Sequence, residues 1–187
     1  MKRDNIKETI LRLLDSYNAD ELSVKVVCAE AGISKQTLYN NYYGILGAVE
    51  EAISDLLEEA TADYTDNHDW LEGLRVIFEM LVRNKNIFTH LYFSKYREDM
   101  LKTIYMVLGT IVAHGVEDCA AKVETELNEY SQKIVVGFYM DICMGIIGRF
   151  IHKKMTEDPA YVAEIYKTLL MDHDTKKVLK DLSAICK

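Results

Sequence analysis

Proline and glycine are scarce in this 187-residue chain, which contains one proline, Pro159, and nine glycines. Sandwiches, barrels and propellers need many tight turns, and tight turns depend on these two residue types. The composition therefore argues against an all-β architecture and predicts an all-α fold built from long helices. A chain of this length buries roughly 70% of its unfolded surface, so it needs neither disulfides nor a structural metal to be stable.

The chain is acidic overall, with a formal net charge of −8, but the charge is unevenly distributed. The first 49 residues carry six basic and six acidic side chains, so the remainder carries the whole acidic excess. This balance excludes a uniformly basic surface that coats nucleic acid without specificity, but it permits a local basic face. The asymmetry predicts two parts with different functions.

Four cysteines are scattered along the chain, at Cys28, Cys119, Cys143 and Cys186. None lies at metal-clip spacing from another, and the chain opens with a charged amphipathic stretch where a signal peptide would be apolar. Free thiols without an export signal indicate a reducing compartment, so we expect a cytoplasmic protein.

The most apolar stretch covers residues 134–151, and two charged residues, Asp141 and Arg149, interrupt it. Charged side chains are costly in lipid, so the stretch favours a helix buried in protein over a membrane span, and no membrane partner is expected. Asp141 would then be a buried carboxylate, which needs a partner. Pairing across an interface is a better explanation for it than ligand binding.

The first fifty residues have the pattern of short helices joined by tight turns. Ser23 can cap a helix from Val24 to Glu30, and Gly32 ends it as a left-handed C-cap residue would. Ser34 can cap the next helix, Lys35 to Asn41. A short helix, a turn with glycine and a second short helix form the helix-turn-helix pattern. Any three helices of a bundle would have a similar sequence pattern. The exposed side chains must therefore distinguish a DNA-binding motif from an ordinary bundle.

The helix that begins at Lys35 has an unusual outer surface. Leu38 and Tyr42 are four residues apart and can anchor its inner face. The remaining side chains are amides, hydroxyls and phenols with one cation and no acid, whereas an ordinary surface helix carries Glu and Lys. Such groups can read base edges and bind phosphate. The expected DNA contacts are Ser23, Lys25, Ser34, Lys35, Gln36, Thr37, Tyr39, Asn40, Asn41 and Tyr43.

Residues 22–42 resemble the DNA-binding segment of the TetR family of bacterial transcriptional regulators. The family pattern is a Ser- or Thr-capped helix, Ala-Gly-Val/Ile-Ser, and then Thr-Leu/Phe-Tyr-x-His/Tyr-Phe. Ala31-Gly32-Ile33-Ser34 and Thr37-Leu38-Tyr39 match it directly, while Asn41 and Tyr42 stand where His/Tyr and Phe are usual.

The resemblance implies a TetR-like fold, with a three-helix DNA-binding domain at 1–46 and a larger helical bundle for dimerisation and effector binding at 47–187. It also implies a homodimer that binds a palindromic operator in double-stranded DNA, most often as a repressor, under control of a small-molecule effector whose identity the sequence does not specify. Apolar periodicity predicts the other helices at 4–18, 44–63, 70–84, 85–94, 97–120, 125–154, 159–171 and 174–186.

One departure from the family pattern concerns Ile45. The family commonly has Lys at this position, where it begins a fourth helix and contacts phosphate. With Ile45 and an electrically neutral first part, attraction to phosphate should be weak. The departure motivates an alternative function, a protein-interaction co-regulator or activator with a weakened DNA-binding domain.

Residues 131–159 resemble the penultimate helix of one TetR C-terminal subgroup, through Gly137-Phe138-Tyr139, an apolar run that contains glycines, and Asp158-Pro159. In the family, the last two long helices of each subunit form a four-helix dimer interface. The residues that this implies at the interface are Phe138, Asp141, Ile142, Gly145, Gly148 and Arg149. A helix in the protein core would have a similar sequence, because core and interface are both apolar.

The middle of the chain is rich in aromatic residues, which could line an effector cavity between helices. The alternative is a packed core in which tyrosines reach water at one end. The residues expected to line the cavity are Tyr92, Tyr96, Tyr105, Met106, His114 and Phe138.

The sequence contains no catalytic set. It has no Gly-rich phosphate loop, no paired Cys ligands and no His-Glu-x-x-His motif. His90, His114 and Cys119 could converge on a metal, but scattered helical histidines are more often surface or hydrogen-bonded core residues. We therefore expect no metal site, no cofactor and no enzymatic activity, and a small helical enzyme is the disfavoured alternative.

Overall fold

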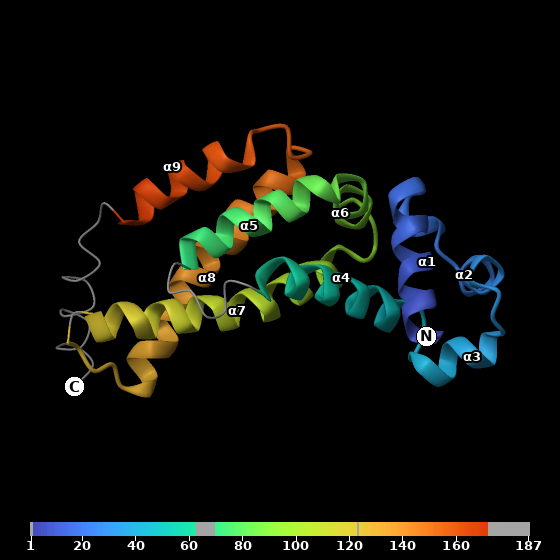
Figure 1. Cartoon of the computed structure of the whole chain (residues 1–187), viewed down its shortest axis with the longest axis horizontal. Coiled ribbons are helices and arrows are strands. Elements are labelled where there is room, and N and C mark those ends of the chain that lie inside the picture. The colour runs from blue at the N-terminus through green and yellow to red at the C-terminus, as the bar shows by residue number, and fades with distance from the viewer. Residues whose placement is uncertain (1, 63–69, 123, 172–187) are drawn as a thin grey trace.

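The computed structural model describes residues 2–62, 70–122 and 124–171 of the chain (Figure 1). Within these ranges the chain forms nine α-helices and one short 3-10 helix, Ala19–Glu21, and no strand, which confirms the predicted all-α fold. The α-helices are α1 (Lys2–Ser16), α2 (Val24–Ala31), α3 (Lys35–Asn41), α4 (Ile45–Thr61), α5 (Trp70–Arg83), α6 (Lys85–Tyr92), α7 (Arg97–Lys122), α8 (Glu129–His152) and α9 (Pro159–Met171).

The helices begin and end close to the predicted positions, with the clearest differences at the start of α8, which begins at Glu129 and not at residue 125, and at the end of α1. The first helix was expected to reach residue 18, but it ends at Ser16, and Tyr17 is 55% exposed. Asn18 ends it locally, because its side chain accepts a hydrogen bond from the backbone N–H of Asp20 and starts the 3-10 helix. The helix predicted at 174–186, which contains Cys186, lies outside the described residues.

The molecule is elongated, with α1, α2 and α3 grouped at one end and the remaining helices extending away from them (Figure 1). α4 connects the two parts, because it packs against α1 on one side and against α5 and α7 on the other. α6 also packs against α1. One continuous hydrophobic cluster extends from Ile6 in α1 to Ala163 in α9. The domain boundary predicted at residue 46 falls inside α4 and stays a prediction.

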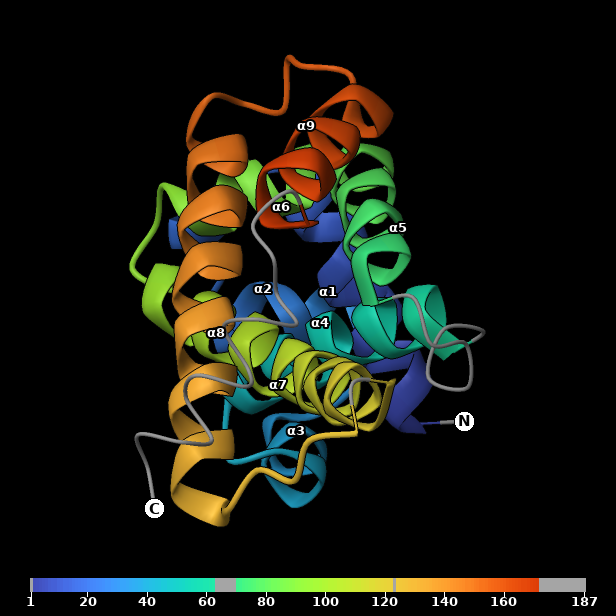
Figure 2. The same cartoon turned by 90° about the vertical axis from the view of Figure 1, so that its left-hand side faces the viewer.

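α8 runs along one outer side of the bundle (Figure 2) and packs against α6 and α7. α7 and α8 are long and apolar enough to cross a membrane by length and composition alone, a test that core helices of soluble proteins also pass. Asp141 was expected to be buried, but in this chain it is exposed on the outer side of α8. The prediction of a buried carboxylate is wrong within one protomer, because α8 is apolar on both sides and its sequence does not show which side faces the core.

Cys143, on the inner side of α8, is fully buried, and burial raises the pKa of its thiol to about 12. The thiolate is the reactive form, so at pH 8 only about one Cys143 thiol in 10⁴ is ionised. We expect iodoacetamide to label the half-buried Cys119 of α7 at least about tenfold faster than Cys143 in the native protein, and both at similar rates in urea. Peptide mass spectrometry over a time course measures both rates, and equal native rates would contradict the burial of Cys143.

Candidate nucleic-acid interface

The turn between α2 and α3 is fixed by local hydrogen bonds that the sequence encodes. The hydroxyl of Ser23 accepts from the N–H of Val26 at 3.3 Å and starts α2, and Ser34 starts α3 in the same way. Gly32 ends α2 at φ 64° and ψ 35°, a left-handed conformation that glycine adopts without steric cost. The N–H of Ile33 then donates to the carbonyl of Cys28 at 2.9 Å. These bonds set the direction in which α3 leaves α2.

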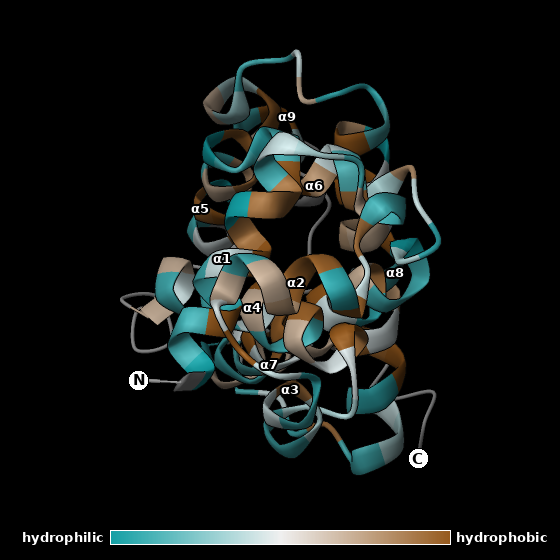
Figure 3. Ribbon diagram, turned by 90° about the vertical axis from the view of Figure 1, so that its right-hand side faces the viewer, coloured by the Kyte–Doolittle hydropathy of each residue, from teal (hydrophilic) through white to brown (hydrophobic). Residues whose placement is uncertain are grey.

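α3 is anchored from the inside and polar on the outside. Leu38 is fully buried and Tyr42, which follows the helix, is 5% exposed. The opposite side presents Lys35, Gln36, Tyr39 and Asn40, all exposed, and α3 contains no acidic residue. In Figure 3, α3 is mostly hydrophilic and lies at the margin of the molecule. The surface is therefore free to meet a ligand that has both hydrogen-bonding groups and negative charge.

The predicted contact residues differ in how free their polar groups are. Asn41 is half-buried and donates to the carbonyl of Thr37 at 2.7 Å, so its amide is partly used within the helix. Gln36 Nε2 donates to Asn40 Oδ1 at 2.8 Å, which joins two exposed amides into one unit. Tyr43 is fully exposed just beyond α3. The groups most available to base edges are thus the Gln36–Asn40 pair, with Lys35, Tyr39 and Tyr43 beside it.

Acidic side chains of α4 neutralise two cations of α1, Arg3 and Lys7. Arg3 pairs with Glu51, and Lys7 pairs with both Glu51 and Asp55. The hydroxyl of Tyr42 donates to Glu51 at 3.2 Å, and the Arg3 guanidinium lies over the Tyr42 ring. Hydrogen bonding to Asp55 raises the pKa of Lys7, and burial raises the pKa of Tyr42. The network fixes the end of α3 to α4, but it leaves little positive charge on α1.

Two other cations of this end have no ion pair among the described residues. Lys25 on α2 and Lys35 on α3 are both exposed. Arg12, in contrast, pairs with Glu30 at 3.0 Å. Among the side chains that the structure describes at this end, the positive charge available for phosphate thus comes mainly from Lys25 and Lys35.

α6 and the segment after it make two polar contacts with α1 and one with the 3-10 helix that follows it. His90 Nδ1 lies 2.7 Å from the carbonyl oxygen of Leu14, and Asn86 donates to Asp15 at 3.2 Å. The backbone N–H of Lys95 donates to the side chain of Asp20 at 3.0 Å. The bundle therefore contacts the end of α1 directly, as well as through α4.

The residues predicted for the dimer interface lie along α8, most of them on its outer side. Phe138 is 61% exposed, and Asp141, Gly145 and Arg149 are also exposed. Ile142 and Gly148 are half-buried, and a Cβ added to Gly148 would lie 4.0 Å from the hydroxyl of Tyr92 on α6. The outer side continues toward the start of the helix with two further exposed apolar side chains, Tyr130 and Ile134.

The structure does not bring the predicted cavity residues together. Tyr92 and Tyr96 are buried in the core, whereas Tyr105, Met106 and Phe138 are 44%, 65% and 61% exposed. His114 is exposed on α7. Helical periodicity explains the difference, since aromatic residues on α6, α7 and α8 point to different sides of their helices.

Comparison with known proteins identifies the family. Residues 68–172, more than half of the chain, match the family model of a transcriptional regulator C-terminal region of the TetR type. The chain belongs to the TetR family of transcriptional regulators. A search of curated proteins finds no match.

Solved structures of TetR regulators share the fold over nearly the whole chain. The dihydroxyacetone kinase operon activator DhaS matches with a TM-score of 0.71 and 14% identity, covering 96% of this chain and 98% of DhaS. A TetR-family regulator from Streptomyces coelicolor matches with a TM-score of 0.59 and 13% identity, covering 97% of this chain and 90% of that one. The TetR family is not enzymatic, so the alternative of a small helical enzyme is excluded.

The α1–α4 ion pairs are the part of this TetR N-terminal end that sequence reasoning missed. Arg3 and Lys7 are four residues apart on α1, and Glu51 and Asp55 are four apart on α4. Each pair therefore occupies one face of its helix, with opposite charge. That matched spacing was a usable signal, although only the packing of α1 on α4 shows that the two faces meet.

We expect Gln36 and Asn40 to act as one recognition unit. Gln36→Ala and Asn40→Ala should each weaken binding to the operator by about 1–3 kcal/mol and relax base preference, because each breaks the same amide pair. The double variant should then lose little more binding free energy than the single variant that binds more weakly. Fluorescence anisotropy with operator and point-mutated duplexes measures all four proteins.

Lys35→Ala is the control for this cycle. Lys35 is an exposed cation on the same helix, so its loss should weaken binding to all duplexes by a similar factor. Costs that simply add in the Gln36→Ala, Asn40→Ala double variant would show that the two amides read separate bases.

Proposed function

We propose that this TetR-family regulator is a homodimeric repressor, which binds a palindromic operator through α3 of each protomer. Release follows when a small-molecule effector occupies the C-terminal bundle. The observation that carries the proposal is the exposed, acid-free surface of α3, which Leu38 and Tyr42 anchor and the Gly32 turn orients. Chemistry of this kind suits the major groove, where amides and cations pair with base edges. We place this activity in the cytoplasm.

The outer side of α8 supports the proposal of a homodimer. Tyr130, Ile134 and Phe138 are 67%, 49% and 61% exposed, an apolar strip that a second protomer would cover. Two-fold symmetry then places two α3 helices on one side of the dimer. We expect them to lie about 34–36 Å apart, or a small multiple of one DNA turn, as operator half-sites require.

The alternative function is an activator or co-regulator of transcription. DhaS, which shares the fold, is named as an operon activator. The paired cations of α1 and the absence of Lys at position 45 likewise suit a co-regulator that contacts DNA weakly and acts through a protein partner. A reporter driven by the gene's own upstream region separates the two: deletion of the regulator raises expression for a repressor and lowers it for an activator.

We expect the DNA affinity to depend only weakly on salt. Each phosphate contact contributes roughly −0.9 to the slope of log affinity against log salt, so few free cations per protomer predict a slope of about −4 to −6 for the dimer. Ile45→Lys should tighten binding to every duplex by a similar factor and add about one unit of slope per subunit, because position 45 begins α4 beside α3. Anisotropy titrations at several salt concentrations measure both slopes.

The matched control for this experiment is Thr110→Lys, which adds the same charge at an exposed position of α7. It should leave the slope unchanged. A steep wild-type slope would contradict the pairing of Arg3 and Lys7 in solution, and the absence of binding to any duplex at low salt would favour the protein-interaction alternative.

We also expect Gly145→Arg to produce monomers. A Cβ at Gly145 meets nothing within 4 Å, so the protomer accommodates the larger side chain, whereas a second protomer on this side of α8 would meet it directly. Sedimentation velocity at micromolar concentration measures the change. Gly109→Arg on α7 is the matched control, since Gly109 is open in the same sense. A monomeric wild type, or a dimeric Gly145→Arg variant, would place the interface elsewhere.

A further inference from the structure

A groove of about 380 Å³ lies between α4 and α7, away from the outer side of α8. α7 packs against α4 on one side and against α8 on the other, so α7 separates the groove from the strip that the homodimer would cover (Figure 2). The residues that line the groove are Ser54, Glu58 and Thr61 from α4, and Met106, Val107, Thr110 and Ile111 from α7. None of them belongs to the expected dimer interface.

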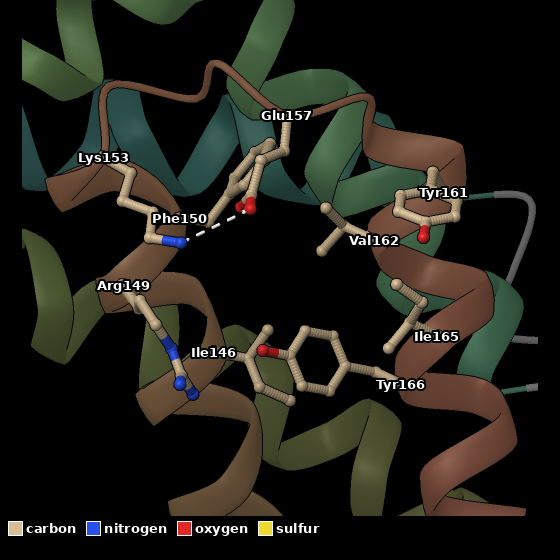
Figure 4. Close-up of a pocket in the computed structure, with 9 residues that line it drawn as sticks. All are labelled: Ile146, Arg149, Phe150, Lys153, Glu157, Tyr161, Val162, Ile165 and Tyr166. Carbon is tan, nitrogen blue, oxygen red and sulfur yellow. Dashed lines mark hydrogen bonds and ion pairs between the residues drawn. The ribbon is translucent and has the colours of Figure 1, made fainter.

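The pocket between α8 and α9 differs in this respect (Figure 4). Arg149 lines that pocket together with Ile146 and Tyr166. Arg149 is also one of the residues expected at the dimer interface, so a second protomer on the outer side of α8 would reach the pocket. Its opening in one protomer therefore does not show a free surface, whereas the opening of the α4–α7 groove does not depend on α8.

α7 forms the apolar wall of the groove. The Met106 side chain is 65% exposed, Val107 is half-buried, and Ile111 is 6% exposed. Methionine is unbranched and flexible, so it adapts to the shape of a ligand. Ligand sites commonly measure roughly 300–1,000 Å³, and a cavity of about 150 Å³ holds one benzene ring. The groove therefore accommodates an apolar body of about two rings.

α4 forms the acidic wall. This helix has no basic residue, and its acidic residues are Glu50, Glu51, Asp55, Glu58 and Glu59. Glu51 and Asp55 pair with α1, but Glu58 has no ion pair with any cation in the part of the chain that the structure describes. Ser54 Oγ donates to Glu58 Oε1 at 2.8 Å, which holds the carboxylate beside the groove. No lysine or arginine is among the described residues that line it, so the groove favours a cation.

The two walls also differ in which hydroxyl groups are available. Thr61 Oγ1 is buried and donates to the carbonyl of Leu57 at 2.8 Å, so it is used within α4. Thr110 is exposed on α7 and can accept a hydrogen bond. A primary ammonium has three N–H donors, which suit one carboxylate and one hydroxyl. The acceptors for such a group come from both helices, Glu58 from α4 and Thr110 from α7.

The dimensions of the groove favour a small molecule over the helix of a protein partner. The lining residues cover positions 54–61 of α4 and 106–111 of α7. At a rise of about 1.5 Å per residue, these stretches are only about 10 Å and 8 Å long. An α-helix is itself about 10 Å wide, so it would contact the groove over little more than one turn.

We propose that this groove binds a primary amine whose apolar body has one or two rings. The ammonium donates hydrogen bonds to the Glu58 carboxylate and the Thr110 hydroxyl. The apolar body lies on Met106, Val107 and Ile111. Anions are excluded by the charge of α4.

This assignment deepens the proposed regulatory function, on which it rests, by naming the class of effector. The amine bridges α4 and α7, and α4 also holds α1 through Glu51 and Asp55. An amine that favours one packing of α4 on α7 shifts the population toward that packing by its differential affinity. Linkage is reciprocal, so the amine and operator DNA weaken each other's binding by one common factor, which we expect to be at least about fivefold.

The test is calorimetric titration of the full-length protein with naphthylmethylamine at neutral pH, without DNA. We expect saturable binding at one site per chain. Naphthalenemethanol, which replaces the ammonium by a hydroxyl, should bind about five- to tenfold more weakly. Glu58→Gln should weaken binding of the amine by a similar factor and leave binding of the alcohol unchanged. Met106→Ser should weaken both ligands severalfold, because it removes apolar contact area.

Glu59→Gln is the matched control, because it removes the same charge at the next residue of α4. Glu59 does not line the groove and lies instead beside Met80 and Arg83 of α5. This variant should bind the amine as wild type does, and circular dichroism checks that each variant is folded. Absence of amine binding to wild type, equal binding of amine and alcohol, or equal losses in Glu58→Gln and Glu59→Gln would overturn the assignment.

The same protein samples are titrated with a duplex from the gene's own upstream region, so that the two proposals fail separately. DNA binding without amine binding overturns the groove and leaves the regulator intact. Amine binding with the expected order of variants, but no DNA binding, supports the groove and overturns the proposed operator function. DNA affinity that saturating amine leaves unchanged overturns the assignment of the amine as effector.

Discussion

The arrangement of the whole molecule depends on α4 being packed into both parts at once. Its buried residues Ala48, Val49, Ile53 and Leu57 belong to the same hydrophobic cluster as α1 and the bundle. Burying a side chain of Val or Leu size contributes about 1.5–3 kcal/mol, so separating α1 from α4 would expose several such groups together. α3 follows α1 and α2 through a glycine turn with fixed hydrogen bonds, and therefore keeps its direction relative to the bundle. Both α4 and α6 pack against α1, so each connects the bundle directly to the end that carries α3.

The same contact between α1 and α4 sets the electrostatics of the DNA-binding end. Glu51 and Asp55 belong to the connecting helix, but they lie beside Arg3 and Lys7 and neutralise them. Tyr42 joins this network by its hydroxyl and its ring, so the end of α3 is held by charge pairs as well as by apolar packing. Exposed ion pairs of this kind contribute little to stability, about 0–1 kcal/mol each. We expect their larger effect to be on DNA recognition, because a surface with few free charges must rely on hydrogen bonds to bases.

Local signals explain what could be predicted from the sequence. The caps Ser23 and Ser34 and the turn residue Gly32 act over three or four residues, so the helix boundaries around them were predictable without tertiary structure. The acids that pair with Arg3 and Lys7 are 48 residues away, and only packing shows that they meet. The sides of α7 and α8 were harder to predict, because a helix that is apolar all round gives no periodic signal for its inner face. For this reason the sequence did not predict that Asp141 is exposed, or that Tyr92 and Tyr105 lie apart and do not share a cavity.

α8, which is one apolar run in the sequence, has three distinct parts in the structure: a buried inner side, an exposed outer side, and last turns that line a pocket and contact α6. Its inner side carries buried core residues such as Cys143 and Ile147, while on its outer side Ile134 and Phe138 are 49% and 61% exposed. Its last turns line the pocket through Arg149 and touch α6 through Gly148. A helix is rigid over this length, so a shift at one end is transmitted to the other. If a second protomer covers the outer side, the spacing of the two protomers and the position of α6 depend on one another through α8. The core would then pack against the inner side of α8 and the second protomer against its outer side. Packing on both sides explains why the helix is apolar all round, with the charged residues Asp141 and Arg149 confined to the side that is exposed in one protomer.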